Sequence, residues 1–239
     1  MKRLRVLMTR QEIVPERLAG ATVVVLDVFM ATTTLLAILE NGASDVYPAE
    51  SLEEAEGLRA RLGPENVLRG GEQDAARIDG YDHGPFPEEY APGVVGGKDV
   101  IFVTTNGTRA IADAAPAGRV LLGCLRNAPA VARELEASAT DSVYLVCAGS
   151  AGRFTVEDFL GAATIISNMN APEEWRRNDA AWLALDFMQR HKDNVHGALE
   201  ESRAGRWFAE NDRMDALRFV ADVGASDLVP EVVGGRAVV

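Results

Sequence analysis

The chain has 239 residues, of which 47% are hydrophobic and 25% charged, a composition typical of a globular protein with a substantial core. Its net charge of −12 argues against a nucleic-acid-binding protein, and it means that an anionic substrate needs a bound cation or local arginines at its site. No segment is long and apolar enough for a signal-peptide core or a membrane span, so we expect a cytoplasmic protein.

The first half of the chain alternates between predicted strands and predicted helices. Strands are expected over residues 4–8, 22–28, 46–48 and 67–70, the second of them buried because it is continuously apolar. Helices are expected over residues 32–39 and 51–62, the second opened by the capping-box pattern Ser51-Leu52-Glu53-Glu54. Residues 73–97 are rich in Gly, Pro and acidic residues and predict a long ordered loop, which in a compact domain is usually functional.

The second half continues this alternation and then becomes mostly helical. Strands are expected over residues 100–103, 120–124 and 143–147, and helices over residues 108–114, 128–137 and 156–169. Beyond them, a stripe of apolar side chains at helical spacing predicts core packing by Trp175, Trp182, Leu185, Phe187 and Met188. Short strands are expected near the end of the chain, over residues 228–230 and 237–239.

This order of elements predicts an α/β protein with a three-layer α/β/α fold and a mostly parallel sheet. We expect a single domain over residues 1–239, with a mostly helical region from about residue 170 onward. The pattern leaves a division of that domain into two lobes open.

Three segments share one design, in which an apolar strand is followed by a loop of small polar residues and then a helix. Their loops lie within Asp27–Thr34, Thr104–Arg109 and Cys147–Arg153. Parallel strands deliver such loops to one edge of a sheet, which is where ligands bind in α/β proteins. Hydroxyl groups, glycines and backbone N–H groups at helix starts suit a phosphate-like anion, so we predict an anion site at this edge.

Acidic residues near these loops suggest a metal. Asp27 ends the buried strand, Glu72 follows two glycines, and Asp82 lies in the acidic loop. Mg²⁺ takes oxygen ligands, and one or two carboxylates suffice because it keeps several waters. We therefore predict a Mg²⁺ site at Asp27, Glu72 and Asp82. The alternatives are a helix N-cap for Asp27 and solvated loop acids for the other two.

The segment Thr104–Arg109 is the most informative of the three loops. Gly107 lets the backbone approach a ligand, the threonines and Asn106 offer hydrogen-bond donors, and Arg109 carries the fork that matches phosphate or sulfonate. The alternative is a polar turn that caps the following helix. A Walker A pattern and a dinucleotide glycine fingerprint are both missing, which disfavours nucleotide binding.

The third loop repeats this pattern in Gly149–Arg153, with Glu157 and Asp158 at the start of the next helix. Those two acids suit metal binding or general-base chemistry, and they equally suit the dipole at a helix start. Cys147 precedes the loop and is either a buried free thiol or a nucleophile. The only other cysteine is Cys124, so the chain is not a disulfide scaffold.

Together these motifs resemble those of the 2-phosphosulfolactate phosphatase (ComB) family. They run in the family's order over roughly residues 20–165, and Thr104–Ala110 is the most specific of them. The matching segments are Asp27–Thr34, Gly71-Glu72, Gly80–Gly84, Thr104–Ala110, and Cys147–Gly149 with Glu157-Asp158. The resemblance implies a Mg²⁺-dependent phosphatase of α/β/α fold that converts 2-phospho-3-sulfolactate to 3-sulfolactate and phosphate. In methanogens that step belongs to coenzyme M biosynthesis.

Three departures from the family's pattern bear on the substrate. Met30 and Gln73 stand where the family usually has arginine, and Gly84–Pro87 stands where it usually has Gly-Asn-Ser-Pro. Each lost bidentate arginine contact removes on the order of 1.5–3 kcal/mol of charge-assisted hydrogen bonding. We therefore expect phosphatase chemistry with an altered preference for the sulfonate-bearing part of the substrate.

These observations predict a small anionic phosphate ester as substrate, neither a nucleic acid nor a membrane as partner, and leave a homodimer open. The predicted catalytic residues are Asp27, Glu72 and Asp158. The predicted substrate-binding residues are Thr33, Thr34, Thr104, Thr105, Asn106, Gly107, Thr108, Arg109, Gly149 and Arg153. Two alternatives stay open: a catalytically weakened family member that binds a small anion, and a hydrolase that uses Cys147.

Overall fold

The computed structural model describes all residues from Met1 to Val239. Its strands are β1 (Arg3–Leu7), β2 (Thr22–Leu26), β3 (Val46–Ala49), β4 (Val67–Gln73), β5 (Ala76–Arg77), β6 (Asp99–Val103), β7 (Arg119–Gly123), β8 (Ser142–Cys147), β9 (Arg176–Arg177), β10 (Glu231–Val233) and β11 (Arg236–Val238). Its helices are α1 (Ala31–Glu40), α2 (Leu52–Leu62), α3 (Pro92–Val95), α4 (Gly107–Asp113), α5 (Ala128–Ala137), α6 (Val156–Ser167), α7 (Asp179–His191), α8 (Val195–Glu200), α9 (Arg203–Glu210) and α10 (Met214–Val220).

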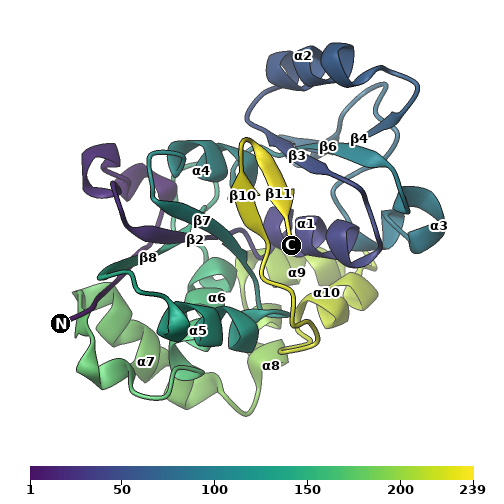
Figure 1. The fold of residues 1–239 in the computed structure, drawn as a ribbon. Coiled ribbons are helices and arrows are strands. Elements are labelled where there is room, and N and C mark those ends of the chain that lie inside the picture. Colours follow the sequence, from purple (N-terminus) through teal and green to yellow (C-terminus); the bar gives the residue numbers. More distant parts are fainter.

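All the strands join one sheet, in the order β5-β4-β6-β3-β11-β10-β7-β2-β8-β1-β9. Strands β4, β6 and β3 are parallel to one another, and so are β7, β2, β8, β1 and β9. The β10–β11 hairpin lies between these two parallel halves and pairs antiparallel with β7 and with β3 (Figure 1). The predicted α/β/α fold with a mostly parallel sheet is confirmed.

The hairpin makes the two halves run in opposite directions. Strand β10 is antiparallel to β7, β11 is antiparallel to β10, and β3 is antiparallel to β11, so three reversals separate β7 from β3. Helix α1 carries the chain from β2 in one half to β3 in the other, and α4 carries it back from β6 to β7 (Figure 1). The polar loops that precede α1 and α4 therefore come from different halves of the sheet.

Local sequence explains the individual elements. Every residue of β2 is buried, as its unbroken apolar run predicts. Ser51 caps α2, where its side chain accepts a hydrogen bond from the backbone N of Glu54 at 3.2 Å, as the capping pattern predicts. Helices α5, α6 and α7 cover one face of the β1, β2 and β8 half and form the largest core with it, and a second core joins α1 and α4 to strands of both halves.

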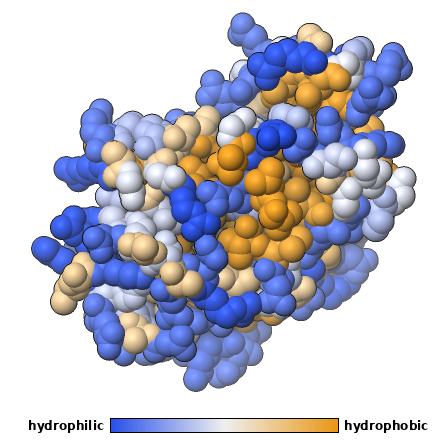
Figure 2. Space-filling model, in the orientation of Figure 1, coloured by the Kyte–Doolittle hydropathy of each residue, from blue (hydrophilic) through white to orange (hydrophobic).

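Some predicted elements differ from the structure. The strand expected over residues 228–230 forms later, as β10, because Glu231–Val233 is the segment that pairs with β11. Trp175 and Met188 are buried as expected, but Trp182 lies on the outer face of α7 and is 61% exposed. None of the helices combines the length and the apolar character that a membrane span requires. Figure 2 shows apolar residues gathered around the β10–β11 hairpin, where Val233 and Val239 are exposed.

Candidate active site

Asp27 lies where β2 ends, packed against the start of α4. Its side chain is only 6% exposed. A Cβ atom on Gly107 would clash with Oδ2 of Asp27 and with the Cβ of Ala31, the first residue of α1. Glycine is therefore needed at position 107 so that α1 and α4 can begin side by side with the carboxylate between them. This contact joins the first and second predicted loops.

Asp158, in the first turn of α6, holds the first and third loops together. Its Oδ1 accepts a hydrogen bond from the backbone N of Val28 at 2.8 Å. Its Oδ2 accepts from the backbone N of Gly149 at 2.9 Å and from Oγ1 of Thr155 at 2.8 Å. These three donors satisfy the carboxylate of Asp158 well. Because one of them is the backbone N of Val28, the residue after Asp27, Asp158 positions Asp27 through the backbone.

Glu72 holds the second loop in a similar way. Gly71 has a φ of 121°, and a Cβ on it would clash with the carbonyl oxygen of Val103, so β4 approaches β6 closely at this point. Glu72 then reaches Thr105, whose backbone N donates to Oε1 at 2.7 Å and whose Oγ1 donates to Oε2 at 2.9 Å. The backbone N of Ala75 also donates to Oε2, at 2.7 Å. Glu72 thereby fixes the position of the Thr104–Arg109 loop.

The second and third loops also meet directly. The backbone N of Ala151 donates a hydrogen bond to Oδ1 of Asn106 at 3.3 Å. The backbone N of Ala148 donates to the carbonyl of Leu26, immediately before Asp27, at 2.7 Å. All three predicted loops therefore meet around Asp27, but they come from the carboxyl ends of two sheet halves rather than from one continuous parallel sheet.

Several carboxyl groups are crowded around Asp27, with few cations to balance them. Burial raises the pKa of Asp27 well above its ordinary value, and the charges of Asp158, Glu72 and Glu157 raise it further, against a hydrogen bond from the backbone of Ala31. Burial and the charge of Asp158 raise the pKa of Glu157 to about 7. Burial raises the pKa of Asp158 to about 6 despite its three donors.

The carboxylates around Asp27 suit Mg²⁺, although protein side chains alone do not complete its coordination shell. No group of three or more His, Cys, Asp and Glu side chains is arranged to hold a metal ion. Asp27 is the one acid of this site whose carboxylate accepts no hydrogen bond from a side chain, whereas Thr105 and Thr155 donate to Glu72 and Asp158. A Mg²⁺ ion commonly takes one or two carboxylates and completes its shell with water and substrate phosphate, so the residues present fit it.

Asp82, the third predicted metal ligand, does not join the other two. Its Oδ2 accepts a hydrogen bond from the backbone N of Arg69 at 2.8 Å, which pins the long loop to the side of β4. The charge of Glu72 contributes to the raised pKa of Asp27, whereas the side chain of Asp82 is held at the backbone of Arg69. The structure therefore brings Asp27 and Glu72 together and leaves Asp82 apart.

The predicted threonines make local contacts. Oγ1 of Thr33 donates to the carbonyl of Val28 at 2.9 Å, and Oγ1 of Thr34 donates to the carbonyl of Pro85 at 2.6 Å. Thr104 and Thr108 bond to each other, since the backbone N of each donates to the side-chain oxygen of the other at 3.1 Å. These four hydroxyl groups shape the loops, and all four residues are buried.

The two predicted arginines lie at the surface. Arg109 is exposed, and its Nε donates to the carbonyl of Glu50 at 3.5 Å. Arg153 is exposed in the tight turn that Ser150 closes with two backbone hydrogen bonds. Gly149, with a φ of 69°, supplies the left-handed backbone that this turn needs.

The C-terminal helices contribute residues that sequence patterns did not single out. Ser202 and Arg203, at the start of α9, lower the pKa of Glu157 in α6, which is 5% exposed, against the larger effect of its burial. Phe208 of α9 stacks on Phe29, two residues after Asp27, with ring centroids 4.5 Å apart. Nothing in the local sequence of α9 indicates this stacking, because its two rings lie more than 170 residues apart in the chain.

The environment of Cys147 disfavours a nucleophilic role. The residue is completely buried. Burial raises the pKa of its thiol well above the ordinary value, and the charges of Asp158, Glu12 and Glu157 add to this effect. A thiolate is the reactive form, so the structure supports a buried free thiol at this position.

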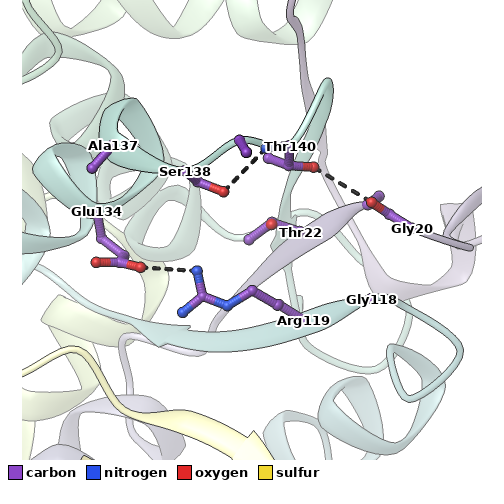
Figure 3. Close-up of a pocket in the computed structure, with 10 residues that line it drawn as sticks. Gly20, Thr22, Gly118, Arg119, Glu134, Ala137, Ser138 and Thr140 are labelled. Carbon is purple, nitrogen blue, oxygen red and sulfur yellow. Dashed lines mark hydrogen bonds and ion pairs between the residues drawn. The ribbon is translucent and has the colours of Figure 1, made fainter.

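A pocket elsewhere in the molecule is unsuited to this chemistry. It lies at the amino ends of β2 and β7, between Gly20, Thr22 and the end of α5 (Figure 3). Its one cation, Arg119, is neutralised by Glu134 at 2.8 Å and by Glu231 at 2.7 Å. The loops around Asp27 follow the carboxyl ends of their strands, away from this pocket.

Comparison with known proteins agrees with the motifs at Asp27. A profile of the 2-phosphosulpholactate phosphatase family matches residues 7–235. The chain belongs to this family. A relative from Symbiobacterium thermophilum is 39% identical over 225 residues, covering 93% of this chain and 96% of the relative. A relative from Caldanaerobacter subterraneus subsp. tengcongensis is 34% identical over 213 residues, covering 89% and 88% of the two chains.

A third relative, from Deinococcus radiodurans, is 34% identical over 227 residues, covering 95% of this chain and 93% of its own. All three relatives carry the name probable 2-phosphosulfolactate phosphatase. The matched region contains the loops around Asp27 and also α9, so the family's shared region includes the helix that covers the site.

Proposed function

We propose that this member of the family is a Mg²⁺-dependent phosphatase that hydrolyses a small phosphate monoester, with 2-phospho-3-sulfolactate as the substrate that its relatives' names suggest. The observation that carries the proposal is the Asp27 carboxylate, which is 6% exposed and lies where the three polar loops meet. A buried carboxyl group among like charges is typical of a catalytic or metal-binding position.

In this proposal Asp27 holds Mg²⁺, which neutralises negative charge and polarises the phosphoryl group when it is bound. Glu72 and Asp158 keep the neighbouring loops in place through hydrogen bonds of 2.7–2.9 Å. Glu157, with a pKa of about 7, carries or releases a proton near neutral pH, as a general acid or base must. Arg109 offers an exposed guanidinium at the rim.

A catalytically weakened protein that binds a small anion is the second candidate. Met30 and Gln73 remove two positive charges that the family's usual pattern supplies. Phe86, in the segment that departs from that pattern, lies 6.1 Å from Phe208 in an edge-to-face contact. This contact adds an apolar side chain beside the first loop, where the usual sequence has small polar residues.

The test is phosphate release by the purified protein from a panel of phosphate monoesters that includes 2-phospho-3-sulfolactate. Each assay is run with MgCl₂ and after exhaustive treatment with EDTA, in parallel with Asp27→Asn. We expect turnover that requires Mg²⁺ and that falls by about 10³ or more in the variant, because the proposal assigns the metal to Asp27. Binding of phosphate without turnover of any ester supports the second candidate, and full activity in EDTA contradicts the first.

A place in coenzyme M biosynthesis and a cytoplasmic location belong to this proposal.

A further inference from the structure

Four arginines line a hollow at the edge of the sheet that β9 forms. They are Arg3 and Arg5 of β1 and Arg176 and Arg177 of β9, and Asn178 completes the lining. Strand β9 is the terminal strand and pairs only with β1, so this hollow opens on a free sheet edge. It contains no acidic side chain, although the chain has 36 acidic residues against 24 Lys and Arg.

The charges of this arginine cluster are not compensated. None of the four guanidinium groups forms an ion pair, whereas other exposed arginines do, such as Arg133 with Asp227 at 2.6 Å and Arg190 with Asp186 at 2.8 Å. Arg3 and Arg176 are direct partners in the β1–β9 register. Like charges placed opposite each other destabilise a sheet, so the protein alone leaves this repulsion unrelieved.

The backbone around the cluster is firmly held. Both polar atoms of the Asn178 side chain bond to the backbone of Val6, at 3.0 Å and 2.9 Å, which fixes β9 against β1. The guanidinium of Arg5 lies over the ring of Tyr144 at 5.2 Å and donates to Oγ of Ser142 at 3.1 Å. An arginine anchored in this way loses little conformational freedom when it binds a ligand.

The cluster lies at the opposite end of the strands from Asp27. Arg3 is in register with Ser142, the first residue of β8, while the active-site loop follows Cys147, the last residue of that strand. A ligand held by these arginines therefore does not touch the reacting group. Any such ligand is a second one, separate from the phosphate ester of the proposed reaction.

We propose that the arginine cluster is a binding site for a small anion carrying two phosphate-type groups. Arg3, Arg5 and Arg176 share one face of this sheet edge, because Arg176 pairs with Arg3 and side chains alternate along a strand, whereas Arg177 pairs with the buried Leu4. The planar fork of arginine matches the oxygens of phosphate bidentately, and these three guanidinium groups can engage two phosphate-type groups. The small size follows from the net charge of −12, because an extended polyanion such as a nucleic acid would meet repulsion beyond the cluster.

The probe is methylenediphosphonate, whose P–C–P bridge a phosphatase does not hydrolyse. Its affinity is measured by isothermal titration calorimetry at constant ionic strength and without divalent metal. The parent is compared with Arg3→Gln/Arg176→Gln and with Arg133→Gln/Arg190→Gln, which removes the same charge from arginines outside the cluster. We expect saturable binding to the parent and the control, and an affinity at least about tenfold weaker in the cluster variant.

A second measurement guards against misfolding. The melting temperature of Arg3→Gln/Arg176→Gln in low salt without ligand should equal or exceed that of the parent, because a repulsive pair is removed. Equal affinity in all three proteins overturns the proposal, and so does a lower melting temperature of the cluster variant. Tighter binding of duplex DNA than of the diphosphonate, or a dimer by light scattering that only the cluster variant loses, overturns it in favour of another partner.

Discussion

Gly107 and Asp27 pack so closely that no side chain fits between them. A Cβ at position 107 would meet Oδ2 of Asp27, the residue that follows β2 in the other half of the sheet. The contact brings the starts of α1 and α4 together, and it leaves Asp27 only 6% exposed. The position of this acid therefore depends on a residue that carries no functional group.

Gly107→Ala should impair turnover strongly because the added methyl group displaces Asp27. A shift of about 1 Å in a catalytic group can cost on the order of 10²-fold in rate. The measurement is kcat/KM together with the melting temperature. Gly57→Ala is the matched control, since Gly57 lies in α2 with open space where a Cβ would be added and should tolerate alanine. Equal activity of the two variants would show that Asp27 can move without consequence.

Asp158→Asn should lower the free energy of unfolding. Asp158 accepts three hydrogen bonds, and an amide replaces one acceptor oxygen by a donor that faces another donor. An unsatisfied buried group costs about 1–3 kcal/mol, which urea unfolding resolves. Thr155→Val removes only one of the three donors and should cost less. The idea that Asp158 holds the two loops fails if both variants are as stable as the parent.

Mg²⁺ should raise the melting temperature of the parent protein and not that of Asp27→Asn. The cation relieves the repulsion among Asp27, Asp158 and Glu72, and ligand binding to the folded state alone stabilises it. The shift is measured over a range of MgCl₂ concentrations, with NaCl at matched ionic strength as control. Asp82→Asn should keep the shift, because the Asp82 carboxylate already accepts a hydrogen bond from the backbone N of Arg69. If the shift in melting temperature is lost in Asp82→Asn and kept in Asp27→Asn, the metal site lies in the long loop instead.

Metal-free protein should become less stable as the pH rises from about 5 to 7.5, the range set by raised carboxyl pKa values. The pKa values of Asp158, about 6, and Glu157, about 7, lie above their ordinary values, so the folded state binds more protons than the unfolded state in this range. The stabilisation is complete below the ordinary pKa values and is lost as the pH passes through the raised ones.

Glu157→Gln should flatten this pH dependence, by on the order of 2 kcal/mol in unfolding free energy at pH 7.5 relative to pH 5. Glu210→Gln, an exposed residue at the end of α9, serves as the control. Urea unfolding at several pH values provides the comparison. Stability that rises with pH in this range would contradict the raised pKa of Glu157.

Arg109→Ala should slow phosphate-ester turnover by about 10-fold to 10²-fold, the value of one charge-assisted hydrogen bond to the substrate. Arg109 lies in the first turn of α4 and keeps one exposed guanidinium near the loop that Glu72 holds. Arg133→Ala removes the same charge from a distant surface and should have no effect. Equal rates for both variants would assign Arg109 to the surface of its helix alone.

The local pattern of the sequence determined the elements and the chemistry of the loops. The apolar run of β2, the cap at Ser51 and the polar segment Thr104–Arg109 are each encoded within about ten residues, where propensity and hydrogen bonding within the segment decide. The family motifs lie in the same short segments. The rule that parallel strands deliver their loops to one edge predicted that the three loops meet, but it covers only the first and third, which follow β2 and β8. The second loop follows β6 in the other half of the sheet, and its contact with Asp27 depends on Gly107.

Only the tertiary structure decided which acids share a site and what covers it. Asp82 bonds to Arg69 and stays apart from Asp27, while Glu157 approaches Ser202 across 45 residues of chain. The reversal of strand direction at the β10–β11 hairpin likewise arises at the very end of the chain. Such contacts depend on packing between segments that are distant in the chain. No local pattern encodes the relative positions of these segments, because burial of the whole core selects them.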